Sequence, residues 1–145
     1  MRKCVQFFGL AAVLVPAVVV LGLRDTALAA QNEISVGGVF VCNIAADASG
    51  YTANERAMAI QQRINGVLST DSFRSNPNVF VHVQPAGSDA LIWVGDKQKQ
   101  ILVFTVTPQD AAGSSVTPLQ LAQQWAPRLA QGLGKAMPSA HWHMF

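Results

Sequence analysis

A helix-start signal near the middle of the chain, Thr52 followed by Glu55, constrains the fold more than any other local feature. The Thr52 hydroxyl can accept a hydrogen bond from the Glu55 amide, and the Glu55 carboxylate can reach back to the Thr52 amide. Behind this capping box, apolar residues recur at helical spacing: Ala57, Ile60, Ile64 and Val67. We therefore predict an amphipathic helix from about Ala53 to Leu68 whose apolar stripe lies on a sheet.

The first 29 residues have the pattern of an export signal. Arg2 and Lys3 precede an apolar run over residues 5–23, and small residues at Ala27 and Ala29 favour cleavage after Ala29. The run is almost long enough to span a bilayer, so its retention as an N-terminal anchor is the alternative. We expect an exported protein of the periplasm or thylakoid lumen, with membrane contact only if this segment is retained.

The charge balance of the remaining chain argues against nucleic-acid binding. Arg2, Lys3, Arg24 and Asp25 account for the whole net charge of +2, so residues 30–145 carry seven basic and seven acidic side chains. A nucleic-acid surface needs a basic footprint that displaces counterions, and an electrically neutral domain does not supply one. The length of 145 residues leaves room for one domain, which we place at residues 30–136.

Cys42 is the remaining cysteine once residues 1–29 are removed, so no internal disulfide is expected. It lies in an apolar stretch, where a free cysteine usually behaves as a small buried hydrophobe. Pairing with a cysteine of another molecule is the alternative.

Five short apolar segments read as strands. Two flank the glycine pair Gly37-Gly38, and three more are separated by turn residues: 34–36, 39–44, 79–84, 90–94 and 101–106. The last three are joined by short turns and predict an antiparallel meander.

A second helix follows the last strand. Thr117 is a suitable N-cap and Pro118 a favoured first helical residue. Pro127 falls inside the apolar pattern and should kink or divide the helix, while Gly132 and Gly134 should mark its end. Residues 137–145 are expected to form a flexible tail.

These elements, in the order β-β-α-β-β-β-α, predict an α+β fold. We expect an antiparallel sheet of about four to five strands with two helices packed on one face.

The order and spacing of several short motifs resemble a known kind of domain. The motifs are Val36-Gly37-Gly38, Glu55-Arg56-Ala57, Gly95-Asp96, Thr105-Val106-Thr107, Asp110-Ala111 and Leu121-Ala122-Gln123-Gln124-Trp125. The chain resembles the extracytoplasmic N-terminal domain that precedes the membrane helices of cyanobacterial mechanosensitive-channel-like proteins. The resemblance covers about residues 35–133 and stops before any pore helix, so it implies a free-standing sensing or interaction domain and no channel activity.

Arg56 and Asp110 occupy positions that look fixed in the resembling family. We predict a partly buried ion pair between them that locks the first helix to the crossover after the last strand. A structural role is favoured over a catalytic one, because an arginine does not give up its proton and is a poor general base. Arg63, further along the helix, is expected on a solvated face.

Metal-capable side chains gather in the last residues. His141, His143 and Met144 are suited to copper in an exported compartment, with Met137 and His82 as further candidates. A tail supplies no preorganised geometry, so we predict no metal site and no cofactor and keep this cluster as a weak alternative.

Catalytic motifs are missing from the sequence. It has no nucleophile elbow, zinc-protease motif, phosphate loop or Cys-x-x-Cys pair. Asp47 and Asp89 could form a carboxylate pair but read more simply as turn residues, and Ser114-Ser115 lack sequence partners. Trp93 and Trp125 are expected in the core.

Three classes of function therefore stay open. The favoured one is a non-enzymatic interaction or sensor domain with a protein partner in an extracytoplasmic compartment, which an exposed apolar groove beside the kinked last helix would support. The second is a small-ligand or metal-binding protein with a pocket of converging polar groups. The third, an enzyme, requires that Asp47, Asp89, Asp110 or His82 cluster in one cleft.

Overall fold

The computed structural model describes residues 32–144, which form an α+β domain, as expected. The predicted export signal lies outside the described residues. The elements run in chain order as β1 (Glu33–Val36), β2 (Val39–Asn43), α2 (Ala53–Leu68), α3 (Asp71–Arg74), β3 (Val79–Ala86), β4 (Asp89–Gly95), β5 (Gln100–Val106), α4 (Pro108–Ala111), α5 (Pro118–Ala136) and β6 (Trp142–Met144). Thr52 caps α2 and Thr117 caps α5, at the positions that the sequence indicated.

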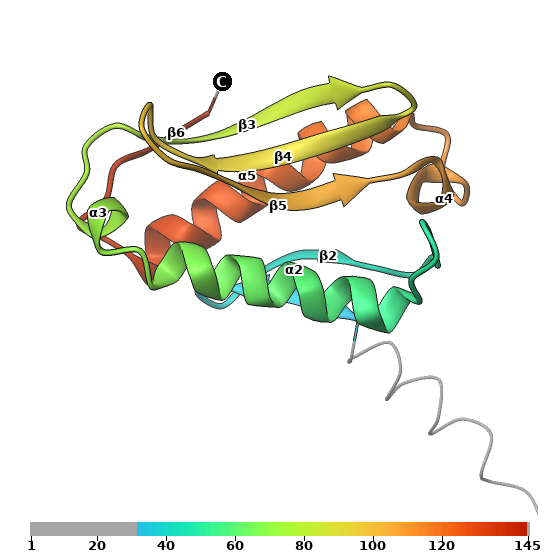
Figure 1. The fold of residues 1–145 in the computed structure, drawn as a ribbon, viewed down its shortest axis with the longest axis horizontal. Helices are drawn as coiled ribbons and strands as arrows, with labels where there is room; N and C mark the ends of the chain where they lie inside the picture. Colours follow the sequence, from blue (N-terminus) through green and yellow to red (C-terminus); the bar gives the residue numbers. More distant parts are fainter. Residues whose placement is uncertain (1–31, 145) are drawn as a thin grey trace, which may run out of the picture.

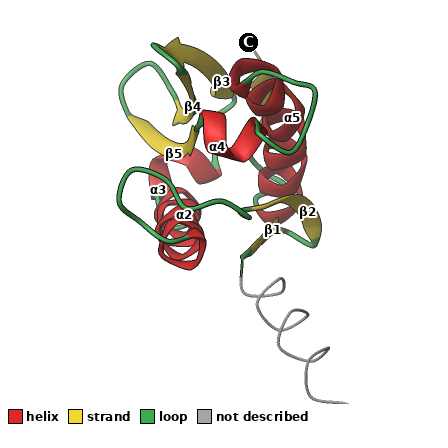
Figure 2. Cartoon of the chain, turned by 90° about the vertical axis from the view of Figure 1, so that its right-hand side faces the viewer, coloured by secondary structure: helices red, strands yellow, loops and turns green. Residues whose placement is uncertain are grey.

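The strands divide into two sheets. The hairpin β1–β2 stands alone, and a four-stranded sheet has the order β5-β4-β3-β6. The β3–β4–β5 meander is antiparallel, whereas β6 joins β3 in parallel. The first hairpin therefore does not extend the main sheet. It forms a separate wall of the core, as Figure 2 shows.

Helix α5 is the central element, because it contacts every strand of both sheets. Helix α2 contacts β5 and β1, and so lies between the edge of the main sheet and the hairpin. Seen close to the axis of α2, the main sheet, α5, the hairpin and α2 surround one interior (Figure 2).

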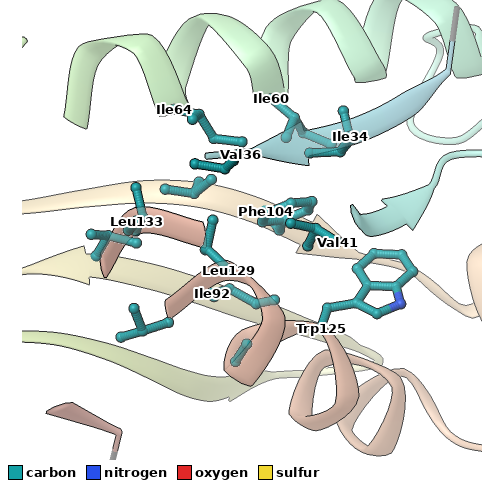
Figure 3. Close-up of a cluster of buried hydrophobic side chains, with 14 of the residues drawn as sticks. Ile34, Val36, Val41, Ile60, Ile64, Ile92, Phe104, Trp125, Leu129 and Leu133 are labelled. Atoms are coloured by element: carbon teal, nitrogen blue, oxygen red, sulfur yellow. The ribbon is translucent and has the colours of Figure 1, made fainter. Parts of the chain in front are cut away.

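The core is built from the inward side chains of these four walls (Figure 3). Ile60 and Ile64 come from α2, and Leu129 and Leu133 from α5, all essentially inaccessible to water. Phe104 of β5 packs against Trp125 of α5 with ring centroids 5.8 Å apart. Burial of such large apolar side chains is the main favourable term in folding.

A β-bulge in β5 turns two neighbouring side chains toward the core. Ile92 pairs with Phe104 but Trp93 pairs with Leu102, so Val103 is the extra residue. The bulge allows Val103 and Phe104, neighbours in sequence, both to be fully buried. Trp93 points to the opposite face of the sheet from α5 and is only half-buried, which corrects its prediction as a core residue.

Helix α5 is longer than the sequence suggested and is not divided. It continues through Pro127 to Ala136 instead of dividing at the proline or ending at the glycines. Pro127 and Gln123 are both exposed, so water can satisfy the carbonyl that loses its amide partner.

The glycine of α5 that seemed to end the helix instead permits a close crossing. A Cβ atom added at Gly132 would lie 2.6 Å from the Val36 carbonyl oxygen. Gly37, at φ 54°, would likewise meet the Gly132 carbonyl, so the two glycines let the hairpin turn rest directly on the helix backbone.

Residues 137–144 pack on the domain, which corrects the expectation of a flexible tail over this stretch. Met137 and Ala140 are buried in the core, and Trp142–Met144 form β6 beside β3. The segment has no alternating pattern of its own. It becomes a strand because it lies against the open edge of β3, whose backbone groups need partners.

Candidate functional site

Arg56 and Asp110 lie together, 54 residues apart in sequence. The guanidinium donates from Nη1 to Oδ1 at 2.8 Å and from Nη2 to Oδ2 at 2.6 Å, which is a two-pronged contact. The side chains are only 10% and 2% exposed. The structure therefore brings together the pair that the sequence reasoning singled out, and water screens it little.

Asp110 is also the third helical residue of α4, in the capping box that starts this helix at Thr107. Its Oδ2 accepts hydrogen bonds from the Thr107 amide at 2.8 Å and from the Thr107 hydroxyl at 2.9 Å. The carboxylate thus has a cation on one side and a helix start on the other. This arrangement fixes the chain where it leaves β5.

Arg56 has two further acceptors on other segments. Nη1 also donates to the Ala46 carbonyl, and Nη2 to the Thr105 carbonyl at 3.3 Å. One guanidinium therefore connects α2 with the loop over residues 44–52, with the edge of β5 and with α4. Of these segments, α2, the loop and β5 form the walls of a groove.

The loop over residues 44–52 is held in a definite shape. Ala48 and Tyr51 exchange backbone hydrogen bonds across a tight turn in which Ser49 has φ 56° and Gly50 has φ 82°. Asp47 accepts a hydrogen bond from the Ala53 amide at 2.7 Å, which ties the loop to the start of α2. A serine in the left-handed region is strained by about 1 kcal/mol or more, and such positions occur preferentially at functional sites.

The groove between this loop, α2 and β5 has a volume of about 420 Å³. We call it the α2–β5 groove. Its lining consists of Ala48, Ser49, Tyr51, Glu55, Arg56, Ala59, Ile60, Arg63, Thr105 and Thr107. This mixture of apolar walls with hydroxyls and charges is typical of a ligand site.

Arg63 is the guanidinium of the groove that has no carboxylate partner among residues 32–144. It is exposed, as expected, and its one hydrogen bond is a long one of 3.5 Å to the Val103 carbonyl. Arg56 and Arg63 therefore both contact carbonyls on the outer edge of β5. They shield that edge from pairing with another strand.

Glu55 supplies the negative charge of the groove. Its Oε2 accepts from the Thr52 amide at 2.8 Å and from the Thr52 hydroxyl at 2.9 Å. These hydrogen bonds lower the pKa of the Glu55 carboxyl. The carboxylate is thus kept ionised, which makes it unsuited to accept and return protons near neutral pH.

The metal-capable residues of the C-terminus do not converge. His143 hydrogen-bonds the Pro77 carbonyl at 3.2 Å, and His141 and Met144 are exposed. Within residues 32–144, no three His, Cys, Asp or Glu side chains lie close enough to hold a metal ion. His82 lies on the outer sheet face opposite Trp93, where burial lowers its pKa.

The residues considered for catalysis are engaged in structural contacts. Asp47 supports the loop before α2, whereas Asp89 begins β4 and accepts from the Ser88 hydroxyl. The Ser114 hydroxyl donates to the Ala111 carbonyl in the turn after α4. Asp110 is committed to Arg56 and to the capping box of α4, and none of the aspartates considered for catalysis lines the α2–β5 groove.

Cys42 is buried, and its burial raises the pKa of the thiol well above the usual range. The predicted burial is confirmed. A disulfide to another molecule would require β2 to leave the core.

Asp96 is a structural residue that the sequence reasoning missed. It lies in the turn between β4 and β5 and is only 8% exposed. It accepts from the Gln98 and Lys99 amides and from the Asn76 side chain, each at 2.8 Å. The hydrogen bonds from Lys99 and Gln98 lower the pKa of its carboxyl.

Comparisons with known proteins assign no activity to this site. Within residues 32–144, no helix combines the length and the apolar character needed to cross a bilayer. No curated protein and no solved structure matches the chain. The sequence pattern of one family, described as Domain of unknown function (DUF8459), matches residues 33–136, which is most of the chain, and the protein therefore belongs to that family.

Proposed function

We propose that this protein is an exported, non-enzymatic interaction domain that binds a segment of another protein in the α2–β5 groove. The observation that carries the proposal is the preformed groove itself. Arg56, on the α2 wall, is fastened to the other two walls through hydrogen bonds to Ala46 and Thr105. A site held open in this way loses little conformational freedom when a partner binds.

The chemistry of the lining favours binding over catalysis. Its ionisable side chains are Tyr51, Glu55, Arg56 and Arg63, and it contains neither histidine nor cysteine. Arg56 is already neutralised, and Glu55 is kept ionised by its hydrogen bonds to Thr52. The Thr107 hydroxyl of the lining donates to Asp110, but that carboxylate is committed to the Arg56 guanidinium and is not free to act as the base that a covalent mechanism requires.

Two sequence features support an extracytoplasmic setting. Residues 1–29 have the pattern of an export signal, and the chain resembles the extracytoplasmic domain of channel-like proteins.

Tyr51, which is 59% exposed at the groove, supplies an aromatic contact of the kind enriched at protein interfaces.

The volume of the groove also favours a second candidate. About 420 Å³ falls within the range of small-molecule pockets, so a small exported ligand is the alternative occupant. The experiment below separates the two, because only a protein partner yields a peptide adduct.

The test is site-specific photo-crosslinking in the host cell. The full chain carries p-benzoylphenylalanine in place of Tyr51, and adducts are mapped by mass spectrometry. We expect an adduct with one segment of a partner protein. Ala59→Trp, which fills the groove, should abolish it. Met58→Trp is the matched control on the neighbouring residue, because Met58 is 56% exposed and does not line the groove.

Two outcomes would overturn the proposal. One is the absence of any protein adduct at Tyr51. The other is an adduct that both tryptophan variants reduce equally, since the contact would then lie outside the groove.

A further inference from the structure

We propose that the α2–β5 groove selects an extended peptide segment with a basic side chain at one end and an acidic side chain about three residues away. This inference rests on the function proposed above and adds the chemistry of the bound segment. It follows from the placement of the two charges in the groove that have no partner of opposite sign among the described residues.

The acidic side chain of the segment is assigned to Arg63. Within residues 32–144 Arg63 has no ion pair, and its single hydrogen bond is 3.5 Å long. Arg56 has both Nη atoms occupied by Asp110 and by backbone carbonyls. Arg63 therefore has donors available for a carboxylate, which the planar guanidinium matches well.

The basic side chain is assigned to Glu55. Both hydrogen bonds from Thr52 fall on Oε2, so Oε1 can accept from a ligand. Tyr51 lines the same end of the groove, two positions before α2 begins, and its ring can stack against an alkyl chain or a cation. The negative charge at this end disfavours a segment with two acidic groups.

The spacing of the two charges sets the length of the segment. Glu55 and Arg63 are eight positions apart on α2, which corresponds to about 12 Å along the helix axis. In the polyproline II form of an extended chain each residue advances about 3.1 Å and three residues make one turn, so side chains three positions apart point the same way and are separated by about 9 Å. Side-chain reach covers the difference.

The edge of β5 explains why side-chain charges, and not an added strand, would govern recognition. Arg56 and Arg63 contact the carbonyls of Thr105 and Val103, which a pairing strand would need. The Thr105 hydroxyl in the groove remains to bond a peptide backbone. Selection therefore depends on the charges at the two ends.

The test uses synthetic tetrapeptides with blocked termini, so that only side chains carry charge. The probes are acetyl-Lys-Ala-Ala-Glu-amide, its reversed sequence, and the Gln/Gln, Glu/Glu and Lys/Lys counterparts. Binding is measured by NMR titration of the full-length protein. Either bipolar peptide should bind about five-fold or more tighter than the Gln/Gln peptide, since each exposed charge pair contributes up to about five-fold.

Two variants make the test specific. Arg63→Glu should reverse the preference, so that the Lys/Lys peptide binds best and the bipolar peptides lose their advantage. Glu55→Gln should lower the advantage of the bipolar peptides while keeping the cap of α2, because glutamine also completes a capping box. Arg63→Gln, which introduces no new charge, should bring the bipolar and the Lys/Lys peptides to equal affinity.

The outcomes separate this inference from the proposed function. Equal binding of all five peptides, or a bipolar preference that survives Arg63→Glu, overturns the charge assignment. The interaction function still stands in that case if the Tyr51 adduct is lost with Ala59→Trp and kept with Met58→Trp. The interaction function itself is refuted if the Tyr51 adduct does not show this response to the two tryptophan variants.

Discussion

Removing one member of the Arg56–Asp110 pair should destabilise the domain far more than removing an exposed ion pair. Asp110→Asn keeps the shape of the side chain but leaves the Arg56 guanidinium, which is 10% exposed, without its counter-charge. Arg56→Met leaves the carboxylate, which is 2% exposed, with only the two hydrogen bonds from Thr107. Each single change should lower the free energy of unfolding by about 3–5 kcal/mol.

A double-mutant cycle isolates the interaction itself. The double variant has neither charge to leave unpaired, so it should be less destabilised than the sum of the single variants by about 2–3 kcal/mol. Urea unfolding followed by tryptophan fluorescence, to which Trp125 packed on Phe104 in the core contributes, gives the four free energies.

The exposed pair of Asp71 and Arg74 provides the matched control. Its N···O distance is 3.7 Å, and its side chains are 97% and 63% exposed. The same cycle with Asp71→Asn and Arg74→Met should give a coupling of about 0–0.5 kcal/mol. The reasoning is refuted if the coupling of Arg56 and Asp110 is equally small, because burial would then not strengthen the pair.

Three further predictions concern the core and the titrating groups. Gly132→Ala should destabilise the domain by about 1–3 kcal/mol in urea melts because the added methyl group collides with β1. Gly66→Ala, which has open space around it, should instead stabilise α2 by about 0.5–1 kcal/mol. A loss of stability in both variants would point to a general intolerance of larger residues. Cys42 should react with iodoacetamide at least about 100-fold more slowly in the native protein than in urea, as followed on its own peptide by mass spectrometry, since the thiol is buried and its pKa raised; rapid native labelling would show that β2 opens. The pKa values of Glu55 and Asp96 are lowered in the folded state from 4.5 and 3.8. The stability that these carboxylates contribute is therefore complete above 4.5 and 3.8, and it is lost as the pH falls through the folded-state pKa values. Asp96→Asn should flatten the dependence of the urea midpoint on pH below about pH 5.

The sequence predicted the elements whose signals are local. The capping boxes at Thr52 and Thr117 place hydrogen-bonding side chains at fixed offsets, so both helix starts could be located from a few neighbouring residues. The strands of the meander were found within one or two residues for the same reason, because turn residues bound them. The prediction of where α5 ends was wrong because Gly132 permits a close contact with β1, which no local pattern reveals.

The groove and the C-terminal strand depend on contacts between distant segments. The walls of the groove come from residues 48–63 and from Thr105 and Thr107, and no short window contains both parts. Residues 142–144 become β6 only through the edge of β3. Asp96 could have been found, since an aspartate at a hairpin tip often accepts from amides two or three residues later.

A buried ion pair is by itself weak evidence for stability, since apolar residues of similar size often serve as well. The additional contacts of Arg56 explain better why this position suits an arginine. Its guanidinium reaches the Ala46 and Thr105 carbonyls as well as the carboxylate, and neither an apolar residue nor the single ammonium of a lysine could span all three in a fixed geometry. Asp110 neutralises the charge that such a connector brings into the interior. The pair is therefore best understood as the part of the molecule that couples folding to the shape of the groove, so that the same contacts that close the domain also hold the binding surface ready.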